Sequence, residues 1–122
     1  MQMLRTPQEA YRRIDFDARV AGADPRQLVA LCFEQLTTAL GSALFAAANG
    51  DNRLKSASLA RALSALTALQ LGVSDDQPIG PALMQLYDSA RRAVLDSVLD
   101  FDAQTISSIR QDFSEIGTAI LN

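Results

Sequence analysis

The 122-residue sequence contains no histidine and no tryptophan, only one cysteine and only six glycines. Without histidine, the sequence excludes Glu-x-x-His di-metal sites, His-based zinc sites and Ser-His-Asp triads. One cysteine excludes an internal disulfide, which is consistent with a reducing compartment. Because Cys32 falls on the apolar face of a predicted helix, it is expected to be a small core residue rather than a nucleophile. The glycines form no phosphate-binding loop, so neither a cofactor nor a metal ion is expected.

Positive charge and long apolar runs are also scarce. The formal net charge is −3 and the sequence pI is about 4.7, which argues against nucleic-acid binding. No uninterrupted apolar run is longer than the one from Ala43 to Ala48, which is far shorter than a bilayer span. No charged-then-apolar leader opens the sequence. The sequence therefore predicts a soluble cytoplasmic protein that neither inserts into a membrane nor binds nucleic acid.

Few residues remain as candidates for catalysis. Carboxylate pairs such as Asp75 and Asp76 are typical of loops and solvated helix faces, and a solid bundle offers no obvious cleft for acid–base chemistry. The two tyrosines lie on apolar stripes, where core packing is the simpler interpretation. One enzymatic alternative stays open, a small all-α ligand-binding enzyme with an arginine cluster around an anion: Arg12, Arg61 and Arg91.

The clearest signals in the sequence mark where helices start and stop. Asp24, Pro25 and Gln27 form a typical helix start, with a capping carboxylate, proline at the first helical position and a glutamine that reaches back to the cap. Gly50 is a typical left-handed stop, so a helix is predicted over about 25–49. A similar start at Thr6 predicts a shorter, polar helix over about 7–20.

Three more helices follow from apolar periodicity, over about 53–71, 79–100 and 103–121, with a loop over 74–81. Alternation typical of β-strands is missing. Four helices of similar length with short connections predict an all-α protein, an antiparallel up-down four-helix bundle plus a short N-terminal helix. One domain over 1–122 is expected, with an N-terminal cap segment at 1–21 and the bundle at 24–122.

The predicted helices carry more apolar surface than one core needs. Helix 25–49 has a wide core arc and, on its opposite side, a second seam that contains Leu31 and Phe45. The non-core side of helix 53–71 is small and carries little charge, and helix 79–100 has an apolar flank beside its core stripe. Such surplus indicates a partner, often a helix laid in a groove. The alternative is scattered surface residues, which are common.

Helix 103–121 repeats its apolar residues at intervals of three and four. The repeat is formed by Ile106, Ile109, Phe113, Ile116 and Ile120. A purely structural coiled-coil dimer is therefore a further alternative, in which this seam would lie between two copies.

The stretch VAGADPRQLVALCFEQ, residues 20–35, resembles the signature of the FliS family of flagellin-specific export chaperones. Family members begin with an Ala-Tyr segment, here Ala10-Tyr11, and continue with a turn that ends in proline and a leucine-rich helix. A Gly-Asp break matches at Gly50-Asp51. A Leu-Tyr-Asp segment followed by two arginines matches at 86–92. The resemblance covers about residues 9–120.

The resemblance implies a helical bundle that is not an enzyme and that binds the C-terminal segment of flagellin in the cytosol. It also implies delivery to the type III export apparatus, where an export-gate component would be a second partner. The expected oligomeric state is a monomer or weak dimer. Another flagellar or type III secreted protein is the alternative client. The residues predicted to bind the partner are Leu54, Ala57, Arg61, Ser64, Ala65, Ala68, Met84, Arg91, Leu95 and Leu99. The residues predicted to contact the N-terminal cap, or to belong to it, are Tyr11, Ile14, Leu31 and Phe45.

Overall fold

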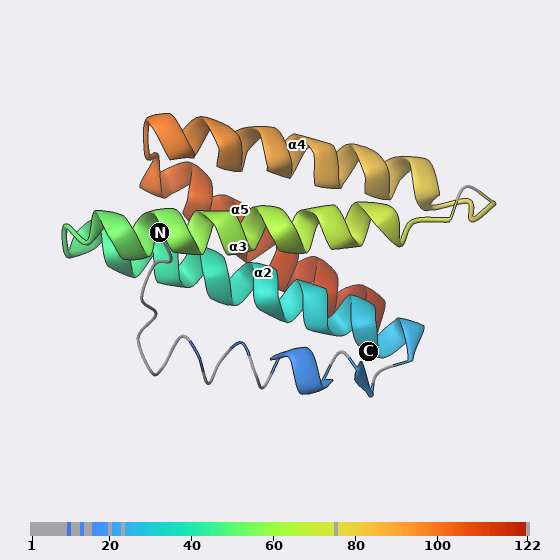
Figure 1. The fold of residues 1–122 in the computed structure, drawn as a ribbon. Helices are drawn as coiled ribbons and strands as arrows, with labels where there is room; N and C mark the ends of the chain where they lie inside the picture. Colours follow the sequence, from blue (N-terminus) through green and yellow to red (C-terminus); the bar gives the residue numbers. More distant parts are fainter. Residues whose placement is uncertain are drawn as a thin grey trace.

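Four long helices form an antiparallel bundle in the computed structural model, which describes residues 10, 13, 16–19, 21–22, 24–74 and 76–121 (Figure 1). The helices are α2 (Pro25–Ala48), α3 (Asn52–Leu71), α4 (Gly80–Leu99) and α5 (Ala103–Leu121). Helix α2 packs against α3 and α5, α3 packs against α4, and α4 touches α5 only lightly. The predicted all-α bundle is therefore confirmed, with helix bounds within one residue of those expected.

The ends of α2 have the predicted chemistry. The Asp24 side chain accepts a hydrogen bond from the Gln27 backbone N–H at 2.8 Å, and the Gln27 side chain accepts one from the Asp24 N–H at 2.9 Å. This capping box satisfies two donors at the start of the helix. After the helix, Gly50 has a φ of 69°, in the left-handed region that favours glycine.

Two further helices begin at a capping aspartate. Asp51 accepts from the Leu54 N–H at 3.0 Å at the start of α3. Asp102 accepts from the backbone N–H groups of Gln104 and Thr105 at the start of α5. Helix α4 has no side-chain cap at Ile79. Its start consequently depends on tertiary packing and on the proline in its first turn.

The core is built around α2 and closes on three aromatic rings. Phe33 of α2, Tyr87 of α4 and Phe113 of α5 lie with ring centroids 5.7–6.4 Å apart. Each ring is at most 4% exposed. Offset and edge-to-face contacts of this kind add to the stabilisation from buried area. Three of the four helices are thus held together at one point.

Helix α5 approaches α2 closely at two glycines. A Cβ atom at Gly117 would lie 2.9 Å from the Phe33 ring, and one at Gly41 would lie 3.0 Å from the Arg110 guanidinium. Helix α3 meets α2 through small residues, and the Ser58 hydroxyl donates to the Ser42 hydroxyl at 2.8 Å. These contacts place α2 at the centre of the bundle.

By length and composition α2 could cross a membrane, although its uninterrupted apolar runs are short. The core helix of a soluble protein can have the same length and apolar composition. Seven residues of α2 are buried in the bundle, which accounts for its apolar composition without a bilayer: Leu31, Phe33, Leu36, Ala39, Leu40, Ala43 and Ala46.

Some expectations from the sequence need correction. Periodicity predicts Val98 in the core stripe of α4, but Val98 is 49% exposed, and Ser97 takes the inward position in that turn at 2% exposed. Leu31 is not such a case: it was expected on the outer seam of α2 as a contact of the N-terminal cap, and it is 7% exposed beside Ala18 and Gly22. Most of the predicted helix at 7–20 lies outside the described residues.

Candidate binding surfaces

Helix α4 presents an exposed apolar row, called here the α4 stripe, formed by Met84, Leu95 and Leu99. These side chains are 39%, 46% and 93% exposed. Intervals of eleven and four residues place them on one side of the helix. Val98, beside them, is 49% exposed. Leu95, Val98 and Leu99 lie within five residues of one another and form an apolar surface of the kind that marks interaction sites. Met84 lies about 16 Å away on the same side of the helix, beyond Asp88 and Arg91.

Arg91, which falls within the α4 stripe, fixes α4 to α3. Its Nε donates to the Gln70 Oε1 at 3.0 Å, and its Nη2 donates to the Thr67 hydroxyl. The next residue, Arg92, pairs with Asp88 one turn earlier along the exposed surface of α4. The Arg91 contacts show that the α4 stripe borders the groove between α3 and α4.

The residues of α3 that were predicted to join the α4 stripe lie on the other side of α3. Ser58 faces α2 through Ser42, and the Arg61 guanidinium donates to the same Ser58 hydroxyl at 3.4 Å. At 100° per residue, Ala57 and Ala68 follow Arg61 along that side. These residues border the groove between α2 and α3, together with Leu54 and Ser64, and we call them the α3 strip.

Ala65 is the exception within the predicted set. It is 5% exposed and belongs to the hydrophobic core, so it is not available to a partner in this structure. Its neighbours Ala57, Ser64 and Ala68 are exposed, whereas Leu54 and Arg61 are half-buried. The sequence pattern could not separate Ala65 from them, because small side chains line both the core and the surface of this helix.

Between the α4 stripe and the α3 strip runs the outward face of α3. Ala60 and Thr67 are exposed there, Ser64 lies at the border with the α3 strip, and none of the three is charged. Leu71, at the end of the helix, is 83% exposed. The charged groups of this face lie away from its middle, with Arg53 at the start of the helix and the Arg91 guanidinium beside Thr67. A chain that crosses α3 at Ala60 and Ser64 would therefore bury only small uncharged side chains of this face, which lowers the desolvation cost of binding. Ala60 and Leu71 were not among the predicted residues, although the same periodicity places both outside the core.

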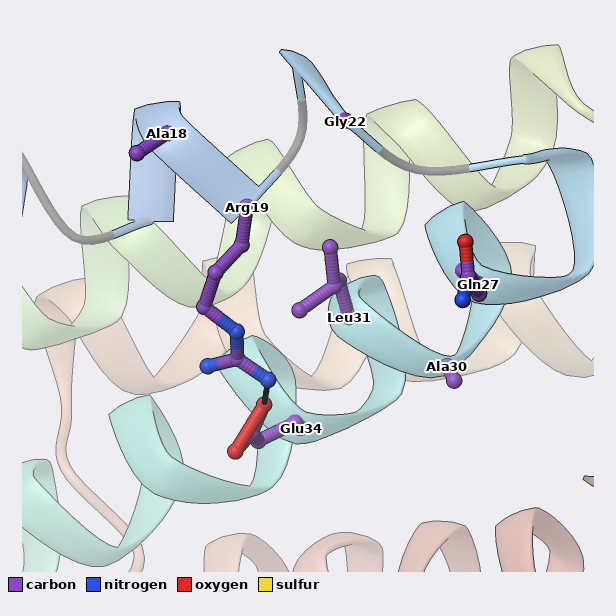
Figure 2. A pocket seen from close by; sticks show the side chains of 7 residues that line it. All are labelled: Ala18, Arg19, Gly22, Gln27, Ala30, Leu31 and Glu34. Carbon is purple, nitrogen blue, oxygen red and sulfur yellow. Dashed lines mark hydrogen bonds and ion pairs between the residues drawn. The ribbon is translucent and has the colours of Figure 1, made fainter.

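The residues predicted to contact the N-terminal cap have different environments. Leu31 lines a surface pocket of about 460 Å³ with Ala18 and Gly22, and Arg19 pairs with Glu34 across it at 2.6 Å (Figure 2). Phe45 lies farther along α2 and is 65% exposed. Tyr11 and Ile14 lie outside the described residues. Leu31 thus faces N-terminal residues, while Phe45 is an exposed ring near the α3 strip.

A second pocket, of about 560 Å³, lies at the end of the bundle where α2 and α4 begin and α3 and α5 end. Cys32 and Tyr87 line it, and burial raises the pKa of both groups; the Cys32 side chain adds to the effect on Tyr87. Both groups are therefore neutral at physiological pH. Within the described part of the chain, no cluster of His, Cys, Asp or Glu could hold a metal ion.

The fold and its surfaces define a class: a helical bundle that presents apolar helix faces for another chain. Comparison with known proteins identifies the family. The model of the family "Flagellar protein FliS" matches residues 7–119, so the chain belongs to the FliS family. The flagellar secretion chaperone FliS of Salmonella typhimurium (strain LT2) is 29% identical over 114 residues, which cover 91% of this chain and 84% of that protein.

Membership confirms the resemblance found in the sequence. It makes the chain a flagellar secretion chaperone by family, with a role in binding a flagellar export substrate rather than in catalysis. Two of the arginines considered for an anion-binding enzyme, Arg61 and Arg91, lie apart. Arg61 hydrogen-bonds toward α2 and Arg91 toward the opposite side of α3, while Arg12 lies outside the described residues.

Proposed function

We propose that this protein binds the C-terminal segment of flagellin in the cytoplasm, prevents its premature polymerisation and delivers it to the flagellar type III export apparatus. The receiving partner would be a component of the export gate. In this proposal the chain acts as one domain, residues 1–122, with 1–21 as a cap on the bundle.

The observation that carries the proposal is the α4 stripe. An amphipathic segment that otherwise pairs with its own kind needs a substitute apolar surface, and Met84, Leu95 and Leu99 supply one on a member of a chaperone family. A client that is disordered before binding must be ordered as it binds, and this cost offsets part of the contact energy, which keeps its release feasible.

The α3 strip is a second surface that the client could contact. Because the α4 stripe and the α3 strip lie on opposite sides of α3, one straight helix does not cover both. We propose that the client crosses the outward face of α3 at Ala60 and Ser64 and contacts both grooves. Phe45 extends the α3 strip along α2 and is exposed enough to take part.

The test is co-purification of the full chain with flagellin from the same organism. Leu95→Asp combined with Leu99→Asp is expected to abolish capture, because two charges would be buried against apolar side chains of the client. Ala57→Asp combined with Ser64→Asp is expected to weaken it by the same mechanism. All four positions are exposed, so folding should be retained, which circular dichroism would check.

Ser89→Asp is the matched control. Ser89 is exposed on α4 but lies away from the α4 stripe, so the variant adds one such carboxylate to the same helix without touching the proposed surface. Capture by this variant should equal that of the wild type. Unchanged capture by the Leu95/Leu99 variant would contradict the placement of the site. A panel of C-terminal segments from other exported flagellar proteins tests the alternative client, and solution mass distinguishes a monomer from a dimer.

A further inference from the structure

The pocket at the end of the bundle has the dimensions of a small-molecule site. Its volume is about 560 Å³, within the range of roughly 300–1,000 Å³ that is typical of ligand pockets. Its lining on α2 extends from Pro25 to Cys32, a depth of about 10 Å along the helix. Most of the lining is aliphatic or aromatic. Polar side chains at Arg26 and Gln77 lie where the helices begin and end.

Tyr87 gives this pocket a specific polar group. Its side chain is 98% buried, since only 2% is exposed. Among the described residues, the Tyr87 hydroxyl has no hydrogen-bond partner. Every side-chain oxygen there that is completely enclosed does have a partner, so the Tyr87 hydroxyl is not completely enclosed. The small exposed part of Tyr87 therefore includes the hydroxyl, and Tyr87 is one of the residues that line the pocket. Buried hydroxyls normally have partners, so this one marks a position for a ligand atom.

The mouth of the pocket is braced. The Arg26 guanidinium donates to the Leu121 carbonyl at 2.6 Å and so connects the start of α2 with the end of α5. Cys32, next to Tyr87, is a weak hydrogen-bonding group. Burial keeps both Cys32 and Tyr87 uncharged, so the floor offers no charge to pair with an ionised ligand.

We propose that this pocket binds an uncharged, largely apolar small molecule of about bicyclic size, with one polar group that hydrogen-bonds to the Tyr87 hydroxyl. The site is separate from the α4 stripe and the α3 strip, and the proposal does not depend on flagellin being the client. A bound molecule would contact residues from all four helices and would stabilise the folded bundle.

The test uses two probes of the same shape, indole and indene, of which only indole has an N–H group. Amide chemical shifts of the isotope-labelled full chain would be followed during titration with each probe. We expect saturable shifts centred on Cys32, Leu69 and Tyr87. Indole should bind about two- to tenfold more tightly than indene, the contribution of one hydrogen bond. Tyr87→Phe should remove this preference while preserving the affinity for indene.

Cys32→Phe fills the floor of the pocket and should abolish binding of both probes. Leu95→Ala, on the α4 stripe, should bind both as the wild type does. If Cys32→Phe does not fold, the indole–indene comparison in Tyr87→Phe decides alone. The proposal is overturned by shifts that do not saturate, by shifts centred on the α4 stripe, or by an indole preference that Tyr87→Phe leaves intact.

Discussion

Helices α2 and α4 are of similar length but have opposite roles in the bundle. Helix α2 starts with a capping box, packs on both α3 and α5, and has seven buried residues between Leu31 and Ala46. Helix α4 starts without a side-chain cap, packs chiefly on α3, and leaves Met84, Leu95, Val98 and Leu99 exposed. The sequence concentrates stability in α2 and leaves apolar surface on α4.

This division suits a protein that must stay folded while it binds and releases another chain. A scaffold helix that is covered on two sides keeps the fold independent of the partner. A peripheral helix can then present apolar side chains without carrying the stability of the core. The comparison makes quantitative predictions, because equal substitutions on the two helices should have unequal effects.

The largest difference is expected for leucine truncation. Leu40 on α2 is fully buried, whereas Leu95 on α4 is 46% exposed. Leu40→Ala should lower the free energy of unfolding by about 2–5 kcal/mol, because it removes buried methyl groups and leaves a cavity. Leu95→Ala should change it by no more than about 0.5 kcal/mol. Urea denaturation measures both values, and equal losses would contradict the assignment of α2 as scaffold.

A smaller effect tests how closely α5 lies against α2. Gly117→Ala would press a Cβ atom on the buried Phe33 ring, whereas Gly41→Ala would meet only the movable end of Arg110. Overpacking costs about 1–3 kcal/mol and alanine recovers about 1 kcal/mol in helix propensity. We therefore expect Gly117→Ala to destabilise by about 1 kcal/mol and Gly41→Ala to be neutral or stabilising. Thermal or urea unfolding measures the change in the free energy of unfolding for each variant. A change of the same sign in both would show that the Phe33 ring yields as readily as Arg110.

The helix starts provide the next comparison. Asp24→Ala removes both hydrogen bonds of the α2 capping box and should cost about 0.5–2 kcal/mol. Ile79→Ala, at the corresponding position of α4, removes no cap and only a half-exposed side chain. Its effect should stay within about 0.5 kcal/mol. Urea midpoints of the two variants measure the difference directly.

Most of the fold could be predicted from the sequence because its signals are local. Caps such as Asp24 and stops such as Gly50 act within a few residues, and apolar periodicity defines one buried face for each helix. The wide apolar arc of α2 also indicated more than one neighbour, and α2 contacts both α3 and α5.

The candidate site was harder to predict because it depends on which neighbour lies on which side of a helix. Periodicity placed Arg61 and Leu95 outside the core, but only the contacts of Ser58 and Arg91 show that they border different grooves. Ala65, which is 5% exposed, was misplaced for the same reason. The end pocket gave no sequence signal, since Cys32 and Tyr87 lie far apart in the chain and meet only in the bundle.

The smallest predicted effect concerns the start of α5, where the Asp102 side chain caps the helix. Helix α4 has no such side-chain cap. Hydrogen bonds from the Thr105 hydroxyl, the Thr105 N–H and the Gln104 N–H lower the pKa of Asp102 below its ordinary value of 3.8. Because the folded pKa is lowered, the charged cap stabilises the protein above the ordinary pKa. This contribution is lost as the pH falls through the folded pKa.

Asp102→Asn should therefore be less stable than the wild type near neutral pH, and the difference in stability should disappear in acid. Asp76, whose pKa is lowered chiefly by the Ser74 hydroxyl, is present in both proteins and cancels in the comparison. Urea midpoints across the acid range measure the gap, and a gap that does not change with pH would show that the Asp102 charge contributes nothing.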